Sequence, residues 1–143
     1  MAAQEAARTG HGVITTTHAL SCSATYYRMV TLCTQKYDMG DKTLHNLVTE
    51  AFPIVLFVKK LEDNSRRVRE ITECEILEDG ARKLHTRYRY HVTENRVVDG
   101  KMKVLGEFQQ VEHISASLQK RLLENGMPVR LLESLVGKEE QSA

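Results

Sequence analysis

The stretch "PIVLFVKKLEDNSRRVREITECEIL", Pro53 to Leu77, decides which architecture the rest of the chain has to fit. A continuous apolar run over 54–58 is followed by the turn signal Asp63-Asn64 and by a second extended stretch over 67–77. Two extended runs joined by a short polar turn predict an antiparallel hairpin. We therefore expect the middle of the chain to be a run of antiparallel strands.

Two further turns, Asp79-Gly80 and Asp99-Gly100, extend this series of hairpins. The strand after the first of them alternates strictly, with Leu84, Thr86, Tyr88, Tyr90 and Val92 on one face and His85, Arg87, Arg89 and His91 on the other. We expect the first face to pack and the second to be basic. The basic face has two interpretations: it pairs with acidic neighbours such as Glu73 and Glu75, or it contacts a phosphate backbone.

Helical patterns flank the predicted sheet on both sides in sequence. Apolar residues at three- and four-residue steps follow Ser21 and predict an amphipathic helix. A second amphipathic helix is predicted to begin at Asp41, which serves as its cap, and to end before Pro53. After the sheet, helices are predicted from the Ser115 cap to 125–126 and from Pro128 onward, before a polar tail at 138–143. The alanine-rich start of the chain predicts a short helix without a capping residue, which we expect to be the end of a longer one.

Composition bounds the class of protein. The chain has 143 residues, 41% of them hydrophobic and 27% charged, with a formal net charge of +1, which suits one domain and indicates no global attraction to nucleic acid or membrane. Three widely spaced cysteines favour reduced thiols in a cytosolic compartment, and the longest apolar run is too short to span a bilayer. We expect a cytoplasmic chain without a transmembrane segment.

The segment "GHGVITTTHAL", 10–20, carries the main candidates for a ligand site. Its five consecutive β-branched residues, 13–17, predict a largely buried strand, and His18 lies just beyond the carboxyl end of that strand. Ligands of open α/β sheets bind at this edge, so Thr16, Thr17 and His18 are candidate donors to a phosphate. The structural alternative is that the threonines fill the strand and His18 bonds to a nearby loop.

Other reactive side chains give weaker signals. Cys22 and His18 allow a Cys/His nucleophile, against the alternative of a small buried thiol. Arg66 and Arg67 are candidates for a ligand or subunit contact, against the alternative of an exposed hairpin corner. The histidines do not have the spacing of a structural zinc site, so we expect no metal. The phosphate-binding motif G-x-x-x-x-G-K-[ST] does not occur.

Four segments in order resemble one family of motor proteins. "ARTGHGVITTTHA" at 7–19 resembles the T-G-H and T-T-x-H-A histidine-box segment of the type II/IV secretion-system ATPases, and "EAFPIVLFVKKLEDNSRRVREITE" at 50–73 resembles the hairpin that follows it. "GKMKVLGEF" at 100–108 and "LQKRLLENGMP" at 118–128 are similar to later segments of the pilus-assembly (CpaF-type) and conjugal-transfer branch.

This resemblance implies an α/β fold, namely the C-terminal portion of a RecA-like P-loop NTPase core with an antiparallel hairpin extension and C-terminal helices. It implies a core part at 1–77, a family-specific extension at 78–137 and a polar tail at 138–143. In that family a cytoplasmic homo-hexamer, docked on an inner-membrane platform protein, uses ATP and Mg²⁺ to drive pilus assembly, protein secretion or DNA transfer. Because the P-loop and Walker B acid have no counterpart here, we expect this chain alone neither to hold nucleotide tightly nor to hydrolyse it.

The resemblance also implies roles for individual residues. His18 matches the histidine-box imidazole near the γ-phosphate, and the same motif includes Thr9, Gly10, His11, Thr16 and Thr17. Arg28, Arg66 and Arg67 are implied as structural or subunit-contact arginines. Asn64 replaces the family's turn glycine, and asparagine tolerates the same left-handed backbone. Leu20 and Met29-Val30 depart from the family pattern.

One hypothesis from a different class remains beside this one. The basic strand at 83–91 is the basis for a non-enzymatic module that binds nucleic acid or a protein partner.

Overall fold

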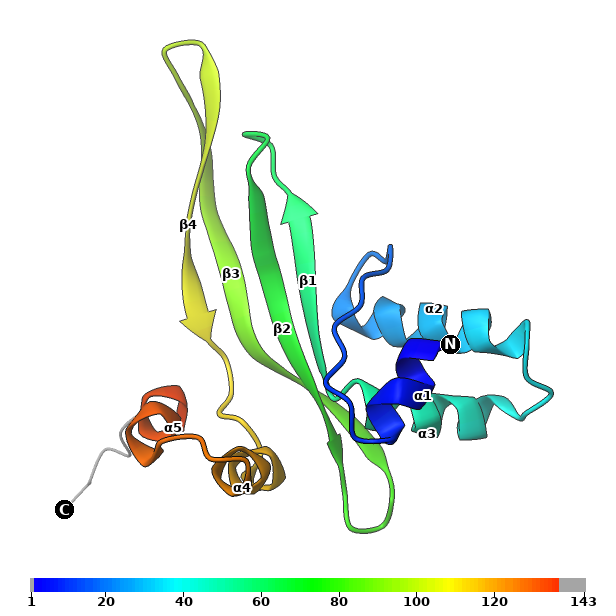
Figure 1. The fold of residues 1–143 in the computed structure, drawn as a ribbon. Helices are drawn as coiled ribbons and strands as arrows, with labels where there is room; N and C mark the ends of the chain where they lie inside the picture. The colour runs from blue at the N-terminus through cyan, green and yellow to red at the C-terminus, as the bar shows by residue number, and fades with distance from the viewer. Residues whose placement is uncertain (1, 137–143) are drawn as a thin grey trace.

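The computed structural model describes residues 2–136 and shows a mixed α/β fold (Figure 1). Its elements, in chain order, are α1 (Ala2–Arg8), α2 (Cys22–Thr34), α3 (Asp41–Ala51), β1 (Ile54–Lys60), β2 (Arg66–Ile76), β3 (Arg82–Val98), β4 (Lys101–Gln110), α4 (Ala116–Glu124) and α5 (Val129–Val136). The four strands form one sheet in the order β1-β2-β3-β4, and every neighbouring pair is antiparallel. The predicted run of hairpins is therefore confirmed.

The turns between the strands have the backbone that their residues predict. Asn64 adopts φ +63° between β1 and β2, which confirms that it takes the left-handed conformation. Asp99 and Gly100 form a two-residue turn with φ +50° and +71°, the geometry that matches the twist of a hairpin. β3 is a single strand of 17 residues, longer than the short segments that the sequence suggested near this turn.

The helices begin and end near the predicted signals. The side chains of Ser21 and Ser115 accept hydrogen bonds from the backbone N–H groups of Ala24 and Leu118, so both serines are N-caps. α3 differs by one residue, since Gly40 is its cap and Asp41 is its first helical residue.

The main core lies between α2, α3 and one face of the sheet. Buried apolar side chains from all three meet there: Tyr26, Val30, Cys33, Leu44, Val48 and Cys74. The Tyr26 hydroxyl, though buried, donates a hydrogen bond of 2.7 Å to the Phe52 carbonyl, at the point where α3 ends and β1 approaches. This core joins the first half of the chain to the sheet.

The predicted strand at 13–17 is wrong for this structure. Residues 11–19 form neither helix nor strand, and Ile14 is 99% exposed. β-branched residues favour an extended chain but form a strand only where a neighbouring strand supplies hydrogen bonds. A cavity lies between this segment and β1, and the segment does not pair with β1 as a strand.

The predicted division of β3 into a packing face and a basic face holds only beyond Arg87, where Tyr90 is buried and Arg89 and His91 are exposed. His85 and Arg87 are buried, whereas Leu84 is 39% exposed. The pairing of β2 with β3 shifts by one residue beside Arg87, a β-bulge that exchanges the two faces of a strand. Beyond the bulge Tyr90 is the buried residue.

The polar tail predicted at 138–143 lies outside the described residues. The division between 1–77 and 78–137 stays a prediction. None of the helices within residues 2–136 has the length and apolar character that crossing a membrane requires.

Candidate functional site

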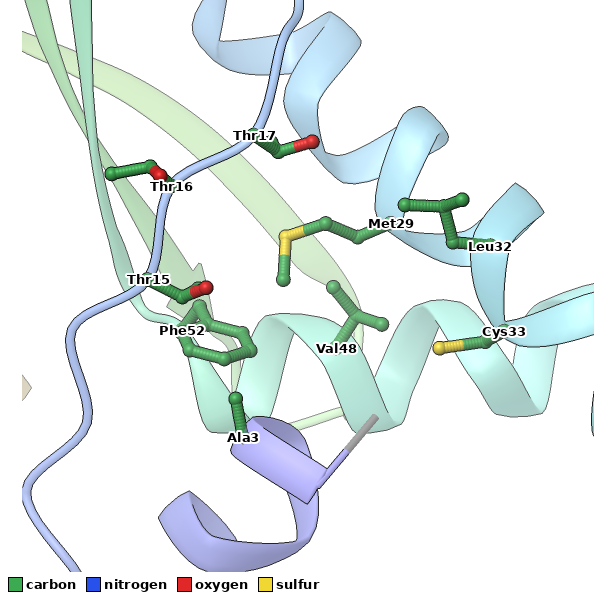
Figure 2. A pocket seen from close by; sticks show the side chains of 9 residues that line it. All are labelled: Ala3, Thr15, Thr16, Thr17, Met29, Leu32, Cys33, Val48 and Phe52. Atoms are coloured by element: carbon green, nitrogen blue, oxygen red, sulfur yellow. The ribbon is translucent and has the colours of Figure 1, made fainter.

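The histidine-box residues Thr16, Thr17 and His18 lie on the extended segment between α1 and α2. Thr16 and His18 are exposed and Thr17 is half-buried. Figure 2 shows the side chains of Thr15, Thr16 and Thr17 around a small pocket of about 130 Å³, opposite Met29 of α2 and close to Phe52. His18 makes no hydrogen bond within residues 2–136, so its ring is open to solvent and to any ligand.

A larger cavity of about 940 Å³ separates this segment from β1. One wall is the run 13–20 and the other is the run 54–58, with Thr25, Met29 and Phe52 at its base. Figure 1 shows the segment running beside β1, which is the edge strand of the sheet on this side. Apart from His18, no lining side chain is titratable, so the walls offer hydroxyls and apolar groups but no cation.

Thr9, Gly10 and His11 occupy a separate turn at the end of α1. The Thr9 hydroxyl lies 3.0 Å from the Ala6 carbonyl oxygen, to which it donates, and 3.2 Å from Nδ1 of His11. Gly10 has φ +90°, the left-handed conformation that ends a helix. Within residues 2–136, no hydrogen bond or ion pair joins this turn to His18, so the structure does not bring the two halves of the motif into direct contact.

The three predicted arginines differ in their surroundings. Arg28 and Arg66 are exposed. Arg67 is half-buried, and its guanidinium carbon lies 5.0 Å from the centre of the Tyr90 ring, a cation–π contact between β2 and β3. The described contacts of Arg67 are therefore structural, whereas Arg66 is an exposed hairpin corner.

Cys22 has the environment of a structural thiol. Its side chain is fully buried at the start of α2, and Sγ donates to the Val55 carbonyl at 3.4 Å. Burial raises the pKa of the Cys22 thiol, with the neighbouring Glu70 carboxylate acting in the same direction. A raised thiol pKa opposes nucleophilic reactivity, so the structural alternative is favoured.

The basic residues of β3 confirm pairing with acidic neighbours. Arg87 Nε donates to Glu73 Oε2 at 2.8 Å, and His85 Nε2 lies 2.8 Å from Glu75 Oε2. These pairs are the first of the two interpretations that the alternation along 84–92 left open. A third carboxylate, Glu112, also contacts both His85 and Arg87, and sequence reasoning missed it because no local pattern connects Glu112 to β3.

Comparison with protein-family models and with curated proteins finds no match. Among the described residues, no group of three or more histidine, cysteine or acidic side chains is arranged to hold a metal ion.

Proposed function

We propose that this chain supplies the C-terminal part of a cytoplasmic, hexameric secretion or conjugation ATPase of the pilus-assembly and conjugal-transfer branch. In the parent motor, ATP and Mg²⁺ bind on an upstream P-loop, and hydrolysis drives movement of pilin, protein or DNA at an inner-membrane platform. His18 is the catalytic residue of this part, placed beside the γ-phosphate together with Thr16 and Thr17. The four ordered sequence segments are the basis for the proposal.

One observation supports it from the structure: the cavity between 13–20 and β1 has the properties of an empty strand position. Both walls are extended, and neither has a strand paired to the side that faces the other. Five exposed apolar side chains line it: Ile14, Leu20, Ile54, Leu56 and Val58, at 99, 90, 42, 56 and 52% exposed. Contiguous apolar surface of this kind marks a site that another segment covers.

A strand from the upstream part of the motor would satisfy both walls at once. Pairing with it would turn 13–17 into the buried strand that its β-branched residues favour, and would shield Leu56 and Val58. His18 would then stand at the end of a central strand, where ligands of α/β sheets bind. The absence of any cation in the cavity is consistent with a phosphate cradle that comes from elsewhere in the parent.

The test uses the protein translated with its upstream coding sequence. We expect that sequence to contain G-x-x-x-x-G-K-[ST] and an acidic Walker B strand, and the longer protein to hydrolyse ATP. His18→Ala should lower kcat by roughly a hundredfold, as does removal of one transition-state donor, with nucleotide binding retained. His91→Ala, an exposed histidine on β3, is the matched control and should keep full activity.

Hydrogen exchange provides a second readout of the same proposal. Amides of 13–17 and 54–58 should be unprotected on their facing edges in the present chain and become protected in the longer protein. A longer protein without the P-loop sequence, or one in which His18→Ala leaves kcat unchanged, would contradict the proposed role.

The basic-strand hypothesis has less support from the geometry. Two of its four alternating basic residues, His85 and Arg87, are buried against carboxylates and are not available to a phosphate backbone. Arg89 and His91 remain exposed.

A further inference from the structure

The turns of two hairpins lie at the same end of the sheet, away from the helices (Figure 1). One turn joins β1 to β2, and the other joins β3 to β4. A hydrogen bond of 3.3 Å connects them, because the Val104 backbone N–H donates to Oδ2 of Asp63. We term residues 58–68 and 95–104 the basic end of the sheet.

Positive charge is concentrated at the basic end. Its two segments contain seven lysines and arginines but only three acidic residues, whereas the whole chain has a net charge of +1. The seven cations are Lys59, Lys60, Arg66, Arg67, Arg96, Lys101 and Lys103. Within residues 2–136 only Arg96 among them is in an ion pair, with Glu94. Of the acidic residues, Asp63 already accepts hydrogen bonds from Ser65 and Val104.

The strand register places these cations directly opposite one another. Three pairs of like charges face each other across neighbouring strands: Lys59 and Arg67, Lys60 and Arg66, and Arg96 and Lys103. Like charges at opposed positions destabilise a sheet. Lysines on the edge strand β1 protect it from aggregation, but this does not account for Arg66 and Arg67, because β2 is an interior strand. A bound polyanion would offset the repulsion in all three pairs.

An exposed aromatic ring lies on the same face as one of these arginines. The guanidinium carbon of Arg67 is 5.0 Å from the centre of the Tyr90 ring, and the Phe108 ring meets that ring edge-on at 5.0 Å. Tyr90 is 3% exposed and Phe108 is 58% exposed. Nε of Arg67 is buried without a hydrogen-bond partner in the described part of the chain. The guanidinium is therefore held by an aromatic ring and not by a carboxylate, and its terminal nitrogens can bind an external anion.

We propose that the basic end of the sheet binds single-stranded nucleic acid. The lysines and arginines contact its phosphates, and one base stacks on the exposed ring of Phe108. Unpaired bases are needed for this stacking, which is why a single strand fits better than a duplex or a lipid headgroup. The site differs from the basic strand at 83–91, since His85 and Arg87 are not part of it. The inference does not depend on the proposed function, because its test uses the 143-residue chain without ATP.

Fluorescence anisotropy with labelled dT and rU oligomers of about 20 nucleotides tests the proposal. Binding of either oligomer supports it. Four phosphate contacts predict that affinity falls roughly fiftyfold between about 50 and about 200 mM NaCl. A duplex of the same length and phosphatidylserine vesicles should bind more weakly, because neither offers a free base to Phe108. The proposal is overturned if neither oligomer binds at about 50 mM NaCl, or if the duplex or the vesicles bind more tightly.

A charge variant locates the phosphate contacts. Lys60→Gln combined with Arg66→Gln removes one exposed pair of like charges, so the fold should not be destabilised. We expect roughly tenfold weaker binding and a salt dependence that is shallower by about 1.4 in log–log slope. Lys36→Gln combined with Lys42→Gln removes the same charge from exposed positions near α2 and α3 and should bind like the original chain. Equal losses in the two double variants would overturn the site.

An aromatic variant tests base stacking separately from charge. Phe108→Leu should weaken binding at least roughly fivefold while the salt slope stays unchanged. Tyr27→Leu, which removes a 70% exposed ring on α2, is the matched control and should have no effect. An unchanged affinity in Phe108→Leu would overturn the assignment to a single strand.

Discussion

The two faces of the sheet are stabilised in different ways, although their residues alternate along the same strand. Toward α2 and α3, β2 contributes Cys74 to an apolar core with Tyr26 and Leu44. Toward the C-terminal arm, residues 112–136 after β4, the neighbouring Glu73 lies in a network with Arg87 and Ser115. Apolar burial is non-directional and insensitive to pH, whereas a buried ionic network depends on every partner and on protonation. One face is therefore stabilised by apolar burial, and the other by charged hydrogen bonds.

We expect the largest loss of stability from a substitution that disrupts the ionic network of Arg87 and Glu73. Arg87→Met leaves the Glu73 carboxylate buried with only Ser115 as a donor, which should lower the free energy of unfolding by about 3 to 5 kcal/mol. Urea denaturation measures this change in the free energy of unfolding. Arg89→Met, an exposed neighbour on the same strand, is the control and should change it by less than about 0.5 kcal/mol. Equal effects of the two substitutions would show that the network does not matter for stability.

A cavity on the apolar face should have the next largest effect. Leu44 is fully buried, and Leu44→Ala should cost about 3 kcal/mol in urea denaturation through lost transfer energy and residual cavity. Leu132→Ala in the arm removes a similarly buried leucine. Because α5 packs mainly on α4, we expect less than half of that loss in global unfolding. A cost for Leu132→Ala as large as for Leu44→Ala would mean that the arm is part of the main core.

A single hydrogen bond within the apolar face gives a smaller effect. Tyr26→Phe removes the donor to the Phe52 carbonyl and should cost about 1 to 2 kcal/mol in thermal or urea unfolding. Tyr27→Phe, one residue further along α2 and 70% exposed, is the control and should be neutral. If both variants are neutral, water satisfies the Phe52 carbonyl.

The smallest effect concerns the pH dependence of stability that arises from the turn between β1 and β2. Hydrogen bonds from the Ser65 hydroxyl and backbone lower the pKa of Asp63, and the Val104 N–H also lies 3.3 Å from its other oxygen. A carboxyl group whose pKa is lower in the folded protein stabilises the fold at pH values above its pKa in the unfolded chain, 3.8. This contribution is lost as the pH falls through the pKa of the folded state.

Asp63→Asn should therefore flatten the acid side of the stability profile below about pH 4, as followed by urea midpoints across pH. Glu62→Gln, the exposed neighbour, should leave the profile unchanged. A profile that keeps its acid slope in Asp63→Asn would show that Asp63 does not contribute to that slope.

Local chemistry was sufficient to predict most of the secondary structure. The turn at Asn64, the caps at Ser21 and Ser115, and the hairpins around them all follow from interactions between residues close in sequence. The candidate site was predicted only in part. The sequence indicated His18 and its threonines, but their relation to β1 depends on which strands stand between them.

The amino-acid sequence alone predicted most of the helices and strands and offered pairing with Glu73 and Glu75 as one of two interpretations of the basic strand, because turn, cap and alternation signals act within a few residues. The tertiary structure alone decided that 13–17 is not a strand, since a strand needs a partner to complete its hydrogen bonds. It also decided that His85 and Arg87 are buried, because Glu112, which follows β4, folds back to contact both side chains. Contacts such as Glu112 with His85 join residues 27 positions apart, and only folding brings them together.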